Sequence, residues 1–254
     1  LAEYVSLKVL EEQQGKTEMR KFLKKALDDY LLRRTLERKR ENALMYNDGQ
    51  GYIHYQKGSL VLYALSDYIG EKNLNNALKK YVEKVQFQEA PYTTSIDMVN
   101  HIKEATPDSL QYVVKDMFET ITLYSNRIVD AKTTKLENGK YQVDIEFEVS
   151  KYRNDEKGKK YYGEKVGDTL SYKTAKMKKP ILSVPLADYI DLGIFTVEVV
   201  DGKKKEVILY FQKHKITAIH NKVSIIVDEK PTEVGIDPYN KLIDSQSDDN
   251  RRKL

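Results

Sequence analysis

The hydrophobic positions of the first 120 residues repeat with the period of an α-helix. In residues 19–31, apolar side chains recur three and four positions apart, which places them on one face of a helix. The same spacing predicts further helices over residues 59–69, 74–85, 96–102 and 107–118. Because each of these helices is amphipathic and the connections are short, the region is expected to form an α-helical bundle or array.

The residues at the ends of these helices support their assignment. Gly70 follows the apolar run 59–69 and is placed to end that helix. Thr94 and Thr106 each precede an apolar run and are predicted to cap the next helix, with Pro107 at the first helical position of the last one.

From about residue 121 the hydrophobic period changes from 3.6 to two. Asn138-Gly139 and Asp201-Gly202 are dipeptides typical of tight hairpin turns. About seven short strands are predicted, including those over residues 141–149, 194–200, 207–211, 216–219 and 223–227. Short strands separated by turns favour an immunoglobulin-like or fibronectin-like β-sandwich.

The chain is therefore predicted to be an α+β multidomain protein. A helical domain is expected over residues 1–125 and a β-sandwich domain over residues 126–232. Residues 233–254 are polar and contain Gly235 and Pro238, so we expect an extended or frayed C-terminal tail there.

Composition excludes several classes of function. The 254 residues contain no Cys, which excludes disulfides, thiol nucleophiles and zinc sites with Cys ligands. The four His are scattered, and no two of them have the i, i+4 spacing of the H-E-x-x-H zinc motif. No window is long and apolar enough to predict a transmembrane helix, so the chain itself is expected to be soluble. The sequence does not indicate a cellular location or an oligomeric state.

Charge is concentrated in one stretch. Residues 1–126 carry 18 basic and 18 acidic residues, whereas residues 151–179 carry ten basic and four acidic ones. This stretch could form a nucleic-acid-binding surface or a long polar loop of the sandwich. The loop is the preferred interpretation, because acidic residues intervene and no nucleic-acid-binding module surrounds the stretch. No nucleic-acid partner is expected. The basic run Arg33–Arg40 is similarly interpreted as a solvated helix face, because Glu37 and Glu41 interleave with it.

One motif carries candidate chemistry. Tyr55-Gln56-Lys57-Gly58, followed by an apolar helix, resembles the Y-x-K-G segment of the aminopeptidase N-like zinc metallopeptidases, the gluzincins. The segments 68–71, 90–94 and 116–124 resemble the helical region of bacterial members. Residues 188–195 resemble a subgroup in which the peptidase is fused to membrane-transporter permease segments. The resemblance implies that Tyr55 is catalytic and donates a hydrogen bond to the tetrahedral intermediate.

The resemblance also implies what this sequence lacks. H-E-x-x-H, the third ligand Glu and the substrate-binding G-x-M-E-N motif are absent, so zinc is a cofactor of the parent protein, with its ligands expected upstream of Leu1. Leu1 lies within a helical pattern, and the chain is therefore expected to be a fragment. Its expected partners are the upstream catalytic domain of the same polypeptide and, in the parent, a peptide substrate. A parent fused to permease segments would be membrane-associated.

Two functional hypotheses follow. In the first, the chain is the part of a zinc aminopeptidase that carries Tyr55, and it is inactive in isolation because it binds no catalytic zinc. In the alternative, it is a non-catalytic interaction module that retains the family shape. His54 is a weak candidate for substrate contact, and Lys57 is expected only to place its aliphatic stem over the helix start.

Overall fold

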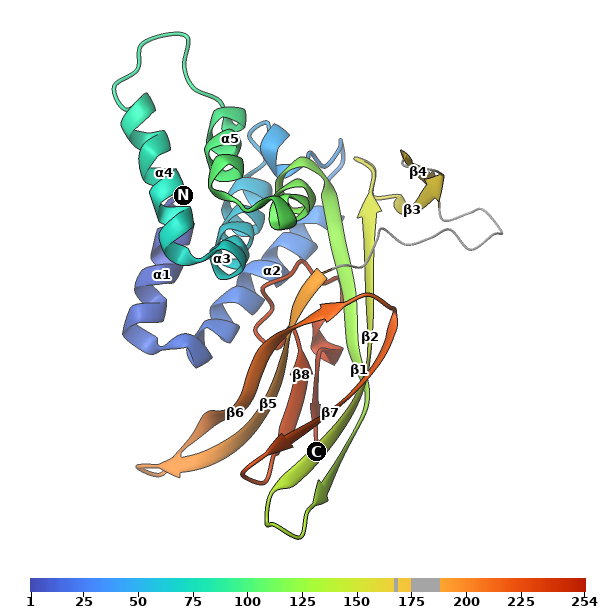
Figure 1. The fold of residues 1–254 in the computed structure, drawn as a ribbon. Helices are drawn as coiled ribbons and strands as arrows, with labels where there is room; N and C mark the ends of the chain where they lie inside the picture. The colour runs from blue at the N-terminus through green and yellow to red at the C-terminus, as the bar shows by residue number, and fades with distance from the viewer. Residues whose placement is uncertain (167–168, 175–187) are drawn as a thin grey trace. The chain divides into compact units, whose positions relative to one another are not determined.

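A computed structural model describes residues 1–166, 169–174 and 188–254 (Figure 1). Its helices are α1 (Ala2–Gln14), α2 (Met19–Thr35), α3 (Gly58–Ile69), α4 (Glu71–Val85), α5 (Ser95–Ala105) and α6 (Gln111–Val114). Two π-helical turns, η3 (Tyr52–Lys57) and η5 (Lys115–Glu119), lie directly before α3 and directly after α6. Shorter 3₁₀ turns are η1 (Lys16–Glu18), η2 (Leu44–Tyr46), η4 (Asp108–Leu110) and η6 (Ser247–Asp249).

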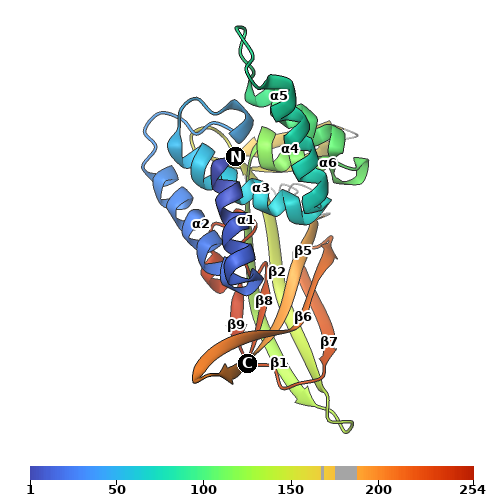
Figure 2. The ribbon, with the colours of Figure 1, turned by 90° about the vertical axis from the view of Figure 1, so that its left-hand side faces the viewer.

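Helix α3 forms the centre of the helical region. All but two of its twelve residues are buried, because its apolar positions surround the whole helix. Helices α1, α2 and α4 contact it, and Figure 2 shows α1 and α2 lying side by side. The helix predicted over residues 59–69 is confirmed, and Gly70 ends it with a φ of 88°.

One of the two predicted caps is present. The side chain of Thr94 and that of Asp97 form a reciprocal capping box at the start of α5, which confirms the prediction for Thr94. The prediction for Thr106 is wrong, because its hydroxyl donates a hydrogen bond of 2.7 Å to the carbonyl of Ile102 at the end of α5. The chain then continues through the short turn η4 rather than through a capped α-helix.

The second half of the chain forms two antiparallel sheets, as expected for a β-sandwich. Its strands are β1 (Ile121–Lys135), β2 (Tyr141–Asn154), β3 (Lys160–Val166), β4 (Thr169–Thr174), β5 (Asp188–Val200), β6 (Lys203–Ile216), β7 (His220–Val227), β8 (Glu233–Ile236) and β9 (Arg251–Lys253). One sheet has the order β1-β2-β3-β4, with β7 also paired to β2, and the other has the order β6-β5-β8-β9. The predicted α+β fold class is therefore confirmed.

Both predicted hairpin turns are confirmed. Gly139 has a φ of 85°, and Asp201 and Gly202 have φ values of 52° and 74°. Two successive positive φ values are those of a type I′ turn, the turn that joins β5 to β6. The strand predicted over residues 216–219 is wrong, since β6 ends at Ile216 and β7 begins at His220.

The C-terminal segment differs most from its prediction. Residues 233–254 were expected to be an extended or frayed tail, but β8 pairs with β5 and β9 pairs with β8. Val234 and Ile236 are buried, and the buried Asp244 accepts a 2.8 Å hydrogen bond from the backbone N–H of Asn126. The prediction was wrong because a short strand that pairs with an existing sheet needs few apolar residues, so its sequence shows little hydrophobic pattern.

The contacts divide the chain into two compact units. The helical unit is Leu1–Thr122 with Arg153–Tyr161 and Lys241–Ile243, and the β unit is Leu123–Tyr152, Tyr162–Asn240 and Asp244–Leu254. The units are not consecutive stretches, because two short segments from the second half of the chain group with the helices. Within the helical unit, Lys241 forms a 2.8 Å ion pair with Asp67.

The start of the basic stretch 151–179 is not a polar loop. Strand β2 continues to Asn154, and β3 begins at Lys160. In the β unit the buried Lys151 forms a 2.9 Å ion pair with Asp188. In the helical unit the buried Arg153 lies 2.5 Å from the carboxylate of Asp116. The side chains of residues 161–179 lie outside the described residues, so nucleic-acid binding by this stretch stays untested.

Candidate functional site

The predicted motif lies on the turn η3, where the backbone widens before the central helix. The N–H of Gly58 donates a hydrogen bond to the carbonyl of Ile53, five residues earlier, as in a π-helix. Residues two positions apart on a helix differ in direction by about 160–200°. Tyr55 and Lys57 therefore point to opposite sides of the turn, Tyr55 outward and Lys57 inward.

Tyr55 is the exposed member of the motif. Its side chain is 52% exposed, and its ring centroid lies 4.4 Å from that of His54. Within the described part of the chain, its hydroxyl forms no hydrogen bond. Because the backbone of Tyr55 leads directly into the buried helix α3, the exposed phenol is held on a rigid support and is available to a ligand.

His54 is fixed by a neighbouring amide. Its Nδ1 lies 2.9 Å from Nδ2 of Asn47, whose Oδ1 accepts a 3.2 Å hydrogen bond from the backbone N–H of Gln50. Because the Asn47 amide nitrogen only donates, Nδ1 of His54 accepts here, and the ring proton resides on Nε2. His54 thus presents an N–H donor beside the phenol of Tyr55.

A small pocket opens beside His54. Its volume is about 180 Å³, less than that of sites which enclose whole small-molecule ligands. The residues that line it come from η2, η3, α3, α5, η5 and the chain start: Leu1, Leu44, Met45, Asn47, His54, Gly58, Leu62, Ser95, Met98, Val99 and Phe118. The pocket has room for a group the size of one side chain.

Lys57 occupies the inner side of the same turn. Its side chain is 1% exposed, and its Nζ lies 3.8 Å from Oε1 of Glu41 and 5.5 Å from the ring centroid of Tyr30. Its ammonium donates no hydrogen bond to any described protein atom. Burial lowers the pKa of Lys57 from 10.5 to about 8, while Glu41 opposes this shift and Arg34 adds to it.

Glu41 joins the groups beneath the turn. It is 3% exposed, accepts a hydrogen bond from the hydroxyl of Tyr30 and lies 2.5 Å from Nε of Arg34. Burial, followed by the charge of Glu41, raises the pKa of Tyr30 well above 10.0. The interpretation of Arg33–Arg40 as a solvated helix face is wrong for Arg34 and Glu41, which tertiary contacts bring into a partly buried ion pair. Lys57 likewise does more than cover the helix start.

A sequence signal for the burial of Lys57 exists. Lys57 follows Ile53 by four residues and precedes Leu60 and Val61 by three and four residues, which is the spacing of one helix face. Ile53, Leu60 and Val61 are all buried. Extending the apolar stripe of α3 back by one turn would therefore have placed Lys57 inside the protein.

The helical region matches a known family. Residues 1–120 fit the family model of the peptidase family M1 domain. The chain therefore contains an aminopeptidase N-like M1 metallopeptidase region. The match ends where β1 begins and includes both η3 and α3. No curated protein sequence matches the chain.

Whether the M1 region could hold zinc depends on how its His, Asp and Glu side chains are arranged. Among the described residues, no group of three His, Asp or Glu side chains is arranged to hold a metal ion. His101 contacts the carbonyl of Asp97, and His220 lies 3.0 Å from Glu148. The donor set that catalytic zinc requires therefore does not fit the residues present, and H-E-x-x-H is absent from the sequence.

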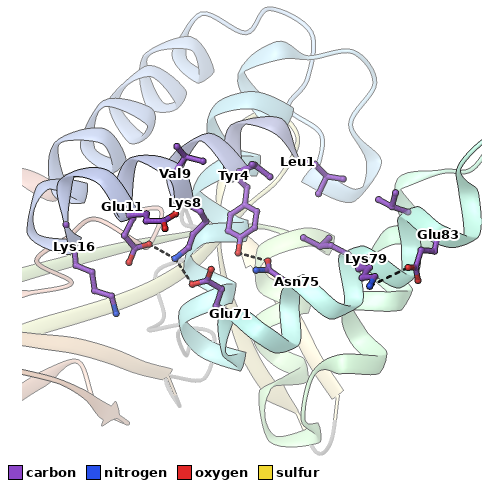
Figure 3. Close-up of a pocket in the computed structure, with 15 residues that line it drawn as sticks. Leu1, Tyr4, Lys8, Val9, Glu11, Lys16, Glu71, Asn75, Lys79 and Glu83 are labelled. Atoms are coloured by element: carbon purple, nitrogen blue, oxygen red, sulfur yellow. Dashed lines mark hydrogen bonds and ion pairs between the residues drawn. The ribbon is translucent and has the colours of Figure 1, made fainter.

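A larger pocket of the M1 region lies between α1 and α4 and has a volume of about 1050 Å³ (Figure 3). Lys8 projects into it and forms ion pairs with Glu11 and, at 2.7 Å, with Glu71. The hydroxyl of Tyr4 donates a 3.1 Å hydrogen bond to Asn75. Lys8 thus lies between two carboxylates of this pocket, and Leu1, Val5, Val9, Leu78 and Val82 form an apolar part of its lining. Across the described residues, no helix has the length and apolar character needed to cross a membrane.

Proposed function

We propose that this chain supplies the oxyanion-stabilising part of an M1 aminopeptidase active site, with Tyr55 as the catalytic donor. The observation that supports it is the exposed Tyr55 hydroxyl, which has no internal partner among the described residues and stands on a turn fixed by the buried helix α3. Its substrate is a peptide with a free N-terminus, as in the family.

In peptide hydrolysis, Tyr55 needs only to hold its hydroxyl where it can donate a hydrogen bond to the carbonyl oxygen. Addition of water to a peptide carbonyl places negative charge on the carbonyl oxygen. A neutral phenol that donates a hydrogen bond to that oxygen stabilises the charge as it develops, and stabilises the uncharged substrate less. Nε2–H of His54 lies on the same side of the turn and is proposed as a weak contact to substrate.

The groups that activate water come, in this proposal, from polypeptide outside these 254 residues. The motif that would hold zinc in this family is absent from the sequence, and the described residues offer no substitute for it. The chain alone is therefore proposed to bind no catalytic zinc and to hydrolyse no peptide. Fusion of the parent to permease segments also remains a proposal, based on the resemblance of residues 188–195.

The role of Tyr55 is tested by Tyr55→Phe in the longer polypeptide that includes the zinc ligands. We expect kcat to fall by roughly 10²–10³ with little change in KM, the usual cost of losing one oxyanion donor. Tyr92→Phe is the matched control, because Tyr92 is also exposed but lies outside the motif. A Tyr55→Phe enzyme with nearly wild-type kcat would remove Tyr55 from the mechanism.

The 254-residue chain provides a separate test. EDTA-sensitive hydrolysis of an aminoacyl substrate by the purified chain would overturn its proposed inactivity. If the longer polypeptide carries no intact H-E-x-x-H and is inactive, the chain is instead a non-catalytic module of the same family.

A further inference from the structure

We infer that Lys57 is a positioning residue for Tyr55: its buried ammonium, held between Glu41 and the ring of Tyr30, fixes the inner side of the turn whose outer side presents the phenol. This inference rests on the proposed function of Tyr55 for its catalytic meaning. The placement of Lys57 itself rests only on contacts within the helical unit.

The geometry couples the two side chains directly. Only Gln56 separates Tyr55 from Lys57, and both belong to the same π-helical turn. A rotation of this turn about its axis would move both side chains at once in opposite directions, and a shift of the turn would move both in the same direction. The position of the Tyr55 hydroxyl thus depends on what holds the Lys57 end of the turn.

The contacts of Lys57 are electrostatic rather than hydrogen-bonded. Its Nζ lies 3.8 Å from Glu41 and over the face of Tyr30, and it donates no hydrogen bond to the described protein atoms. A buried ammonium without hydrogen bonds is costly, and an apolar side chain of similar length would be cheaper to bury. Stability alone does not account for a lysine at this position.

The charged and titratable groups that face Lys57 come from two elements and the loop between α2 and η2. Tyr30 and Arg34 belong to α2, Glu41 lies in the loop, and Tyr52 belongs to η3 itself. Tyr52 stacks on Tyr30 with their ring centroids 6.0 Å apart, and its hydroxyl lies 3.3 Å from Glu37. Of these groups, Glu41 attracts the ammonium and Arg34 repels it.

Protonation of Lys57 therefore sets how firmly the turn is held. The charged form is attracted by Glu41, and the neutral form is not. Because burial brings the pKa of Lys57 to about 8, the attraction is lost within a pH range that leaves ordinary lysines charged. Tyr55 is expected to be most narrowly positioned below pH 8 and to gain freedom above it.

The test follows both side chains by NMR in the 254-residue chain. Ring carbons of tyrosine and Cε of lysine are labelled, and resonances are recorded from pH 6.5 to 9. Tyr55 is assigned through Tyr55→Phe. The titration is made in a His54→Gln background, because the imidazole of His54 lies tilted at 4.4 Å from the Tyr55 ring and would itself affect its resonances. We expect the Tyr55 and Lys57 resonances to shift together, with one midpoint near 8. Different midpoints, or a static Tyr55 resonance, would overturn the inference.

A variant gives a second reading. Lys57→Met, of similar length but uncharged, should abolish the shift of Tyr55 between pH 7 and 9. Lys79→Met is the control, because Lys79 is an exposed lysine on α4 and its replacement should leave the shift intact. A Tyr55 shift that persists in Lys57→Met contradicts the inference. Circular dichroism at 222 nm checks that each variant is folded. The shared midpoint is measured with Lys57 itself unsubstituted, so it does not depend on the folding of Lys57→Met.

Activity separates this inference from the proposed function. In the longer polypeptide, Lys57→Met should lower kcat by about 10- to 100-fold with KM nearly unchanged, because the donor is displaced rather than removed. If Tyr55→Phe leaves kcat unchanged, the proposed function fails, yet the NMR titration still decides whether Lys57 positions Tyr55. If Tyr55→Phe lowers kcat and Lys57→Met does not, the inference alone fails.

Discussion

The two π-helical turns of the helical unit each bury one charged side chain, but they neutralise it differently. In η5, the buried Asp116 lies 2.5 Å from the guanidinium of Arg153, close enough for a charge-assisted hydrogen bond. In η3, the buried Lys57 lies 3.8 Å from Glu41 and forms no hydrogen bond within the described residues. The carboxylate of Asp116 is therefore hydrogen-bonded to its partner, whereas the ammonium of Lys57 is only attracted electrostatically to Glu41.

This difference separates a structural turn from a candidate functional one. The ion pair of Asp116 and Arg153 ties η5 to the end of β2, and each group satisfies the other. The ammonium of Lys57 forms no comparable hydrogen bond within the described residues, and the opposite side of its turn exposes Tyr55. Widened helical turns recur at functional sites, where they aim particular side chains. The comparison indicates that η5 holds the fold together, whereas η3 orients the phenol at some cost in stability.

Removal of the η5 carboxylate should have the largest effect. Asp116→Ala leaves Arg153 buried and without its partner carboxylate, and we expect the free energy of unfolding of the helical unit to fall by about 3–5 kcal/mol. Urea unfolding followed by circular dichroism at 222 nm measures this. Asp108→Ala, at an exposed acidic residue of η4, should change it by less than about 0.5 kcal/mol. A loss below 1 kcal/mol for Asp116→Ala would abolish the contrast between the turns.

The matching change in η3 should be mild. Lys57→Met removes a buried charge that donates no hydrogen bond and leaves Glu41 paired with Arg34 and Tyr30. Replacement of a buried charge by an apolar side chain is often neutral or stabilising, so we expect a change within about 1 kcal/mol of wild type. A loss as large as that of Asp116→Ala would show that Lys57, too, is mainly structural.

The parts predictable from sequence are those determined by local patterns. The helix cap at Thr94 and the hairpin at Asp201-Gly202 each depend on residues within four positions of one another, and both predictions are confirmed. The apolar run of α3 likewise identifies the central helix. Tyr55 is found from the sequence only through its resemblance to a family motif, because nothing local distinguishes it from the other exposed tyrosines.

The parts that escaped prediction depend on distant partners. Glu41 lies in a run of charged residues that is typical of a solvated surface, and it is buried because Tyr30 and Lys57, 11 and 16 residues away, meet it. Arg153 belongs to a basic stretch but pairs with Asp116, 37 residues earlier. The tail 233–254 becomes ordered because β5 offers β8 an edge. Hydropathy along the chain contains none of this information.

The pH dependence of stability sharpens the comparison, because the buried Lys57 of η3 should contribute to it. The unfolded chain keeps the Lys57 proton up to about pH 10.5, whereas the folded chain releases it near 8. Between these values the unfolded state binds more protons, so folding becomes more favourable as pH rises. We expect wild type to gain about 1–2 kcal/mol relative to Lys57→Met between pH 8 and 10.

This gain runs against the loosening of Tyr55 over the same range, because a neutral amine is cheaper to bury but is no longer attracted by Glu41. Above pH 10 stability should fall in both proteins, since burial raises the pKa values of Tyr30, Tyr52 and Tyr63, and the unfolded tyrosines lose protons first. Denaturant unfolding at fixed pH steps measures the difference. Parallel curves for wild type and Lys57→Met would place the Lys57 pKa at its ordinary value.

The smallest expected effect concerns Gly58, the first residue of α3 directly after η3; the residue directly after η5 is Thr120. Gly58 has helical dihedral angles, and an added Cβ would lie 3.5 Å from the carbonyl of Ile53 and 3.6 Å from Leu44, which are ordinary contacts. Gly58→Ala should therefore stabilise the helical unit by about 0.5–1 kcal/mol, because alanine favours a helix. Gly70→Ala is the matched control and should destabilise it by about 1–2 kcal/mol, since φ is 88° there. If Gly58→Ala also destabilises, the η3 region costs stability at Gly58 as well as at the buried charge of Lys57.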